Sequence, residues 1–188
     1  IDNHAFDFGI FVLITSFNPV RIYRFDDVLV RFCGEEYHPF DTEKRNKYVV
    51  REGSKTIYEM PSFKDIYKIY GFSSKVMFEN YISERGHDLK AFWQRIDEAI
   101  VKVVLNAEPI VRQSLRNFKY SPTNFFELVR FDIVLDVNLN PYVLEVNMSP
   151  NITPADKKYE ECATIYEQMV HNVVKMVGGG SFNEFWSR

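Results

Sequence analysis

The chain has 188 residues, of which 46% are apolar, 26% charged and 16% aromatic, and its formal net charge is −3. This balance is typical of a folded globular protein and excludes the disordered and fibrous classes. So small a net charge does not indicate a nucleic-acid or membrane-surface protein. The two cysteines follow no metal-ligand spacing and favour a reducing compartment.

The longest apolar run, residues 9–14 (GIFVLI), is far shorter than the roughly 20 residues that a helix needs to cross a bilayer, and no signal-peptide pattern is present. The chain begins with Ile1 rather than methionine and enters a predicted strand almost at once. We therefore expect it to be a piece of a longer protein, in which any targeting signal would lie upstream.

Strand patterns dominate the first part of the chain. Residues 5–16 (AFDFGIFVLITS) are long and β-rich, which predicts a strand. Asp26 and Asp27 predict a turn between two short strands within residues 19–33. Together these segments predict an antiparallel meander over the first seventy residues. Residues 35–62 are polar and charged and predict a long loop, a kind of segment that is usually functional or disordered.

Apolar residues three and four positions apart predict a helix over residues 88–106. Pro109 is expected to break or kink this helix, and a second helical piece is expected to run to about Phe118. Residues 73–88 are more typical of a solvated connector than of a partner-facing loop and short helix. Pro154 is predicted to open a last helix and residues 178–180 to end it. The expected buried stripe of this last helix is Tyr159, Cys162, Ile165, Tyr166, Met169, Val173 and Met176.

The segment Arg130 to Pro150 (RFDIVLDVNLNPYVLEVNMSP) predicts a hairpin with a turn around residues 138–139. Because strand side chains alternate between faces, an even-numbered loop would direct the apolar residues of both strands into the core. The residues expected in the core are Phe131, Ile133, Leu135, Tyr142, Leu144, Val146 and Met148. This register places Asp132, Glu145 and Asn147 together on the opposite face.

Like charges opposite one another destabilise a sheet, so this cluster makes sense if a cation binds there. Mg²⁺ takes oxygen ligands, usually one or two carboxylates together with substrate phosphates. Asp132 and Glu145 would supply the carboxylates and Asn147 an amide oxygen. On the residues alone, a solvated hairpin face whose acids pair with lysines or arginines explains the pattern equally well.

Two segments resemble the tubulin tyrosine ligase-like family. Residues 125–152 (FFELVRFDIVLDVNLNPYVLEVNMSPNI) are similar to the pattern F-E-L-x-G-F-D-x-x-x-D-x-x-L-x-P-W-L-L-E-V-N-x-S-P. Residues 6–32 (FDFGIFVLITSFNPVRIYRFDDVLVRF) are similar to K-F-D-x-R-x-Y-V-L-V-T-S-x-x-P-L-R-I-Y-x-x-x-x-G-L-V-R-F. The resemblance implies an α/β ATP-grasp fold, with an antiparallel sheet flanked by helices. It also implies that residues 1–188 are the C-terminal portion of the ligase domain, with the upstream half missing.

The resemblance further implies an ATP- and Mg²⁺-dependent ligase. Such enzymes phosphorylate a carboxylate, and the amine of a free amino acid then displaces the phosphate to form an amide bond. Glutamate is the expected amino acid, and the acidic tails of tubulin or microtubules, or another protein, are the expected acceptor. We accordingly expect a monomeric, cytoplasmic, cytoskeleton-associated protein that binds no nucleic acid and has no membrane segment in this stretch.

Site residues follow from the resemblance by position. Asp132, Glu145 and Asn147 match the ligands of Mg²⁺ bridging the ATP phosphates. Asp7 matches an aspartate near the nucleotide, and Arg31 matches an arginine beside the active site, which makes it the expected catalytic residue. Without the resemblance, Arg31 would be taken for an ordinary edge-strand arginine.

The chain departs from the family pattern at charged positions. Ala5 replaces a lysine, Gly9 replaces an arginine, and Arg130 replaces a glycine, where it would either crowd the site or supply the missing guanidinium. Two alternatives therefore remain open. The protein is either an active, divergent ligase or a pseudoenzyme that keeps the fold as a tubulin-binding or regulatory module.

A further departure is the replacement of an H-L-T-N segment by residues 46–60 (NKYVVREGSKTIYEM). Lys47, Arg51 and Lys55 of this stretch are candidates to replace the lost positive charge.

Overall fold

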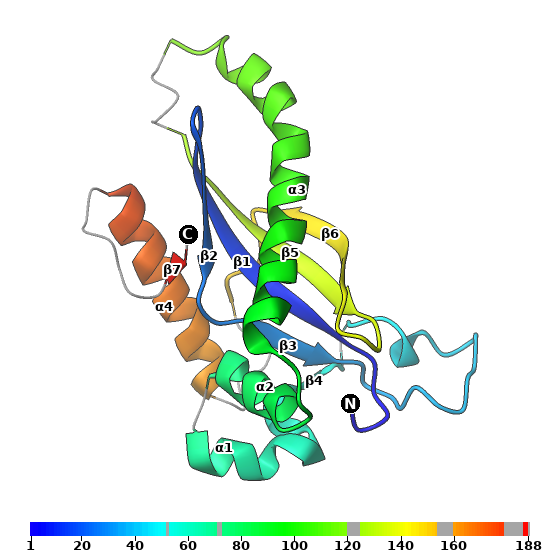
Figure 1. Cartoon of the computed structure of the whole chain (residues 1–188). Coiled ribbons are helices and arrows are strands. Elements are labelled where there is room, and N and C mark those ends of the chain that lie inside the picture. Colours follow the sequence, from blue (N-terminus) through cyan, green and yellow to red (C-terminus); the bar gives the residue numbers. More distant parts are fainter. Residues whose placement is uncertain (52, 71–72, 120–124, 154–159, 179–185, 188) are drawn as a thin grey trace.

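The computed structural model describes residues 1–51, 53–70, 73–119, 125–153, 160–178 and 186–187. Figure 1 shows a twisted sheet with a long helix across one side. The strands are β1 (Phe6–Phe17), β2 (Val20–Phe25), β3 (Leu29–Phe32), β4 (Lys55–Thr56), β5 (Glu127–Leu135), β6 (Pro141–Met148) and β7 (Trp186–Ser187). The helices are α1 (Lys64–Tyr70), α2 (Ser74–Ser83), α3 (Leu89–Leu115) and α4 (Glu160–Val177), with short 3₁₀ turns at Arg45–Lys47, Ile57–Glu59 and Pro61–Phe63.

The central strand of the sheet is β1, and its partners β2, β3 and β5 are all antiparallel to it. β5 runs along one edge of β1, while β3 and β2 follow one another along the other edge. The predicted turn at residues 26–27 is confirmed, since it joins β2 to β3. The predicted meander is wrong in its order, because β1 rather than β2 lies in the middle and α1 also belongs to this part of the chain.

The hairpin of β5 and β6 is confirmed, but its predicted even-numbered loop is wrong. Residues 136–140 connect the strands, and a β-bulge shifts the register between Asp132 and Ile133. Asp132 lies opposite Glu145, whereas Ile133 lies opposite Val143, so Leu144 forms the bulge. Because a one-residue shift exchanges the faces of a strand, the bulge compensates for the odd loop.

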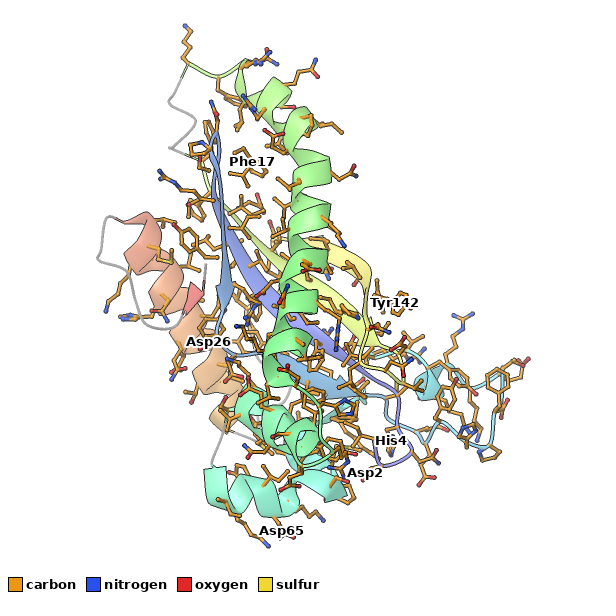
Figure 2. All side chains as sticks on the ribbon, viewed as in Figure 1. Asp2, His4, Phe17, Asp26, Asp65 and Tyr142 are labelled. Carbon is orange, nitrogen blue, oxygen red and sulfur yellow. The ribbon has the colours of Figure 1, made fainter. Side chains whose placement is uncertain are left out.

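The bulge exchanges the faces of the β6 residues before it, so that Val143 rather than Tyr142 reaches the core. Val143 and Val146 pack against it, whereas Tyr142, Leu144 and Met148, which were predicted to be buried, are 57%, 62% and 71% exposed. Figure 2 labels Tyr142 on the outer side of the hairpin.

Alternation along β1 divides the apolar core between the two faces of the sheet. On one face, Phe8, Ile10 and Val12 pack with α2 and α3. On the other face, Phe11 and Leu13 pack with α4 through Ile165, Met169 and Val173. The predicted apolar stripe of α4 is therefore confirmed at these three residues, and Tyr166 and Met176 also pack there.

The predicted end of the last helix is confirmed, because α4 ends at Val177 and Gly178 follows. Pro154 and Tyr159 lie outside the described residues, as does the side chain of Cys162. No helix in the described ranges is long and apolar enough to span a membrane.

The predicted break at Pro109 and the predicted solvated connector at residues 73–88 are wrong, whereas a kink at Pro109 stays a prediction. α3 continues through Pro109 to Leu115 as one helix. Leu105 and Ile110 on this part of α3 are 51% and 70% exposed, so water can hydrate the carbonyl group of residue 105 that the proline leaves without a donor. Residues 73–88 are not a solvated connector, because they contain α2, whose Phe78 is fully buried.

The long loop predicted for residues 35–62 is confirmed only in its first part. Residues 35–51 and 53–54 are irregular apart from one 3₁₀ turn, whereas residues 55–63 contain β4 and two further 3₁₀ turns.

Candidate active site

The face of the sheet that packs on α4 also carries a group of charged residues. Asp7 and Gly9 precede Phe11 on this face of β1. Arg31 of β3 lies opposite Asp7, and Asp132 of β5 lies opposite Gly9. Three neighbouring strands therefore bring two acids and an arginine together, although they are distant in sequence.

Arg31 joins the two aspartates. Its Nε and Nη2 atoms donate hydrogen bonds to both carboxylate oxygens of Asp7, at 2.8 and 2.9 Å. Its Nη2 also lies 3.1 Å from Oδ1 of Asp132. Bidentate pairs of this kind are among the stronger and more directional polar contacts. Because β3 lies between β1 and β4, Arg31 is not on an edge strand. The interpretation of Arg31 as an ordinary edge-strand arginine is therefore wrong.

A second guanidinium reaches the same carboxylate. Arg130 donates from Nε to Oδ1 of Asp132 at 2.7 Å and from Nη2 to Oδ2 at 3.0 Å. Its side chain is 15% exposed, and that of Asp132 is 7% exposed. The sequence analysis left open whether Arg130 crowds the site or supplies the missing guanidinium, and its position two residues before Asp132 on one strand indicates that both share a face.

The three predicted metal ligands lie together. Asp132 and Glu145 face each other across the hairpin, and Nδ2 of Asn147 lies 3.1 Å from one oxygen of each. Two carboxylates and an amide form an oxygen-donor set of the kind that suits Mg²⁺. Within the described ranges no three His, Cys, Asp or Glu side chains form a metal-binding group, so the set depends on the amide oxygen of Asn147.

A cavity of about 380 Å³ opens beside this cluster. Among the described residues, its charged lining consists of Asp7, Arg31, Arg130, Asp132 and Glu145. Its remaining wall includes Ala5, Cys33, Leu144 and residues 48–50 of the loop that precedes β4. A small anionic ligand that entered the cavity would therefore meet both guanidinium groups and the candidate metal ligands.

The two aspartates differ in their electrostatic surroundings. Burial raises the pKa of Asp7, the negative charge of Asp132 adds to this effect, and Arg31 together with a weaker contribution from Arg130 only partly opposes it. Burial also acts to raise the pKa of Asp132, but hydrogen bonds and positive charge from Arg130 and Arg31 outweigh it, so this pKa lies below its usual value. Asp132 is thus held ionised, which is the state that a metal ligand requires.

The three basic residues that were candidates to replace the lost positive charge, Lys47, Arg51 and Lys55, are not among the described residues that line the cavity. Lys47 is buried and donates to the carbonyl oxygen of Pro39. Nζ of Lys55 lies 3.3 Å from Nε2 of His4. In the described part of the wall neither these lysines nor Arg51 lines the cavity, so the positive charge there comes from Arg31 and Arg130.

Comparison with known proteins gives a consistent result. The model of the tubulin-tyrosine ligase family matches residues 1–182. A probable tubulin polyglutamylase of Caenorhabditis elegans, ttll-15, is 38% identical over 179 residues, which cover 95% of this chain and 34% of that protein. The mouse tubulin monoglutamylase TTLL4 is 33% identical over 186 residues, covering 95% of this chain and 15% of that protein. The human tubulin polyglutamylase TTLL5 is 27% identical over 189 residues, covering 95% and 14%.

The chain thus spans about a third or less of the length of these relatives. The antiparallel sheet with helices on both faces agrees with the predicted ATP-grasp fold. Since the family match extends over nearly every residue, the chain belongs to the tubulin-tyrosine ligase family.

Proposed function

We propose that this protein is an ATP- and Mg²⁺-dependent ligase that adds glutamate to the acidic tails of tubulin or of another protein. The observation that carries the proposal is the meeting of Asp132, Glu145 and Asn147 on one face of the hairpin, beside a cavity with two guanidinium groups. The glutamylase names of the relatives support glutamate as the added amino acid.

Each residue has a role that follows from its contacts. Asp132, Glu145 and Asn147 would hold Mg²⁺, which neutralises phosphate charge during phosphoryl transfer. Arg31 fixes the orientation of Asp132 through their 3.1 Å contact and adds positive charge at the cavity. Asp7 holds Arg31 in place with two hydrogen bonds. Phosphoryl transfer depends mainly on such positioning and charge neutralisation.

The proposed chemistry has two steps. An oxygen of the acceptor carboxylate attacks the γ-phosphorus of ATP, and ADP leaves. The amine of free glutamate then attacks the acyl carbon, inorganic phosphate leaves with the electrons of the broken C–O bond, and the amine loses a proton as the amide forms. The products are therefore ADP, phosphate and a glutamylated acceptor protein. The ligase itself is proposed to be associated with the cytoskeleton.

One observation favours a catalytically impaired protein as a second candidate. Both oxygens of Asp132 already accept hydrogen bonds from Arg130, and Asn147 donates to one of them. A carboxylate that its own protein satisfies so fully is stable without a metal. A pseudoenzyme would retain this network as part of its structure.

Thermal unfolding of the full-length protein with and without Mg²⁺–ATP tests the proposal. Ligand at about 100 times its Kd stabilises a folded protein by about 2.7 kcal/mol, which shifts the Tm measurably. We expect this shift in the wild type and its loss in Glu145→Gln. The matched control is Glu84→Gln, which changes an exposed acid at the end of α2 and should keep the shift.

Incorporation of labelled glutamate into tubulin then separates the two candidates. An active ligase incorporates label in the wild type and in Glu84→Gln, but not in Glu145→Gln. A nucleotide-dependent shift without incorporation into tubulin or other acidic acceptors would favour the pseudoenzyme. A wild type that shows neither would contradict the proposal.

A further inference from the structure

The side chain of Arg130 crosses the sheet directly above Gly9. A Cβ atom built on Gly9 would lie 3.2 Å from Cδ of Arg130 and 3.3 Å from Cβ of Leu29. Contacts this short are tighter than most real Cβ contacts, so a side chain at position 9 would displace the arginine or the leucine.

The backbone does not explain the glycine. Positive φ angles among the described glycines occur at Gly53 and Gly86, and Gly9 lies inside the regular pairing of β1 with β3 and β5. A glycine inside a strand often marks the close approach of another group. Here the approaching group is the aliphatic stem of Arg130.

The register explains how the arginine reaches this position. Arg130 lies opposite Phe11, and Asp132 lies opposite Gly9. The side chain of Arg130 leans along β5 by two residues to reach Asp132, and this path passes over Gly9. Arg130 therefore delivers its guanidinium to the space above position 9, where a long side chain on β1 would otherwise extend.

The charges at the cavity show why a second guanidinium matters there. Among the described lining residues, Asp7, Asp132 and Glu145 carry three negative charges against the two positive charges of Arg31 and Arg130, which leaves one negative charge uncompensated. Mg²⁺–ATP itself carries net negative charge. Without Arg130 the lining would be more negative by one further charge, and the repulsion of the ligand would increase.

We propose that Arg130 is a nucleotide-binding residue whose guanidinium contacts the phosphates of Mg²⁺–ATP, and that Gly9 is the space that admits it. This inference rests on the proposed function. If Asp132 held Mg²⁺, the guanidinium of Arg130 would lose its present acceptor and would be able to bind phosphate oxygens, which match its geometry. Relative to the family pattern, arginine and glycine have then exchanged places between neighbouring strands: glycine stands at position 9 of β1 and arginine at position 130 of β5.

An exchange of the two residues tests this inference in the full-length protein. The four proteins are the wild type, Arg130→Gly, Gly9→Arg and the double variant that carries both changes. Without ligand, Gly9→Arg should lower the Tm, because two arginines compete for one space, and the double variant should recover most of this loss. With Mg²⁺–ATP, Arg130→Gly should raise the Kd about tenfold or more, as expected for a lost charge-assisted contact, and the double variant should restore at least part of the affinity.

Recovery in the double variant is the decisive result, because interacting residues give non-additive effects. Arg130→Lys, which keeps the charge without the planar fork, should bind with intermediate affinity. The inference would be overturned if the change in Tm of the double variant equalled the sum of the two single changes and its fold-change in Kd equalled their product. Wild-type affinity in Arg130→Gly would overturn it as well. A wild type that does not bind Mg²⁺–ATP at all would instead overturn the proposed function, and the inference with it.

Discussion

The side-chain amide of Asn147 lies 3.1 Å from Asp132 and at the same distance from Glu145, donating from its single nitrogen to both acids. It therefore bridges the carboxylates of two residues that the register places directly opposite each other. The amide supplies partial positive charge where we propose that a cation binds. Rotation of the same amide by half a turn would present its oxygen to a metal instead.

Replacing this amide by a third carboxylate tests that arrangement. Without divalent cations, Asn147→Asp should lower the free energy of unfolding at pH 7 by about 2 kcal/mol, because two hydrogen bonds to charged acceptors are lost and like charges are brought together. Millimolar Mg²⁺ should recover most of this loss. Urea unfolding with and without Mg²⁺ measures both effects.

The control is Asn151→Asp, which changes an exposed asparagine outside the cluster and should respond little to Mg²⁺. If Asn147→Asp were as stable as the wild type without metal, the hydrogen bonds from the amide to the two acids would not stabilise the protein.

The sequence allowed the composition of this cluster to be predicted, but not the way in which it forms. The alternation of acids and apolar residues indicated that Asp132, Glu145 and Asn147 share a face. The bulge at Leu144 was not predictable, because its position depends on how β5 packs on β1 as well as on the hairpin itself. The exposure of Tyr142 follows from the same bulge.

The helices show a similar limit of local patterns. Residues 73–88 contain Ser, Glu, Arg and Asp, and this polarity suggested a connector. Tertiary contacts favour the helix here: the ring centroid of Phe78 lies 4.8 Å from that of Phe8 and 5.7 Å from that of Phe92. Conversely, the proline at position 109 is tolerated because this part of α3 is solvated.

The burial of α2 predicts a large effect of truncation in the core. Phe78 is fully buried between β1 and α3, so Phe78→Ala removes a ring that its neighbours cannot replace. We expect the free energy of unfolding to fall by about 3–5 kcal/mol, as is usual for aromatic residues in a core. Equilibrium urea unfolding measures this loss. Ile69→Ala, at a side chain that is 72% exposed, should change the same quantity by less than about 0.5 kcal/mol. Similar small losses in both variants would mean that α2 is not part of the core.

The buried Asp27 predicts a pH dependence of stability. Burial raises its pKa from 3.8 to about 6, although the backbone N–H groups of Lys75 and Val28 donate to its carboxylate. Between these two pH values the folded protein binds the proton more tightly than the unfolded chain does. The contribution of Asp27 to the free energy of unfolding therefore falls as the pH rises from about 4 to 6, and stays low above that pH.

Asp27→Asn should remove this dependence, because the amide oxygen can still accept from both N–H groups but does not titrate. Relative to the variant, the wild type should lose on the order of 2 kcal/mol between pH 4 and 7. Urea unfolding of both proteins across this range gives the comparison. Parallel pH profiles for wild type and variant would show that another group is responsible.

The double contact of Arg31 predicts that its loss destabilises the fold in a pH-dependent manner. Arg31→Gln leaves Asp7 and Asp132, whose side chains are 9% and 7% exposed, without the charge that joins them. Breaking an ion pair that is largely buried costs about 3 kcal/mol at neutral pH, where the carboxylates are ionised. The loss should shrink as the pH falls, because a protonated carboxyl group no longer depends on the guanidinium. For Asp132, whose folded pKa lies below its usual value, the stabilisation is present above pH 3.8 and is lost as the pH falls through the folded pKa.

Arg31→Lys distinguishes the charge of this residue from its planar fork. The ammonium group cannot make the paired hydrogen bonds to Asp7 and still contact Asp132, so we expect it to recover only part of the stability at pH 7. Arg21→Gln, at an exposed arginine of β2, is the control and should be nearly neutral at every pH. Calorimetric Tm values at pH 7 and pH 4 report all four proteins. Full recovery by lysine at pH 7 would show that positive charge alone stabilises Asp7 and Asp132, whereas partial recovery at pH 7 assigns the remaining stability to the bidentate geometry.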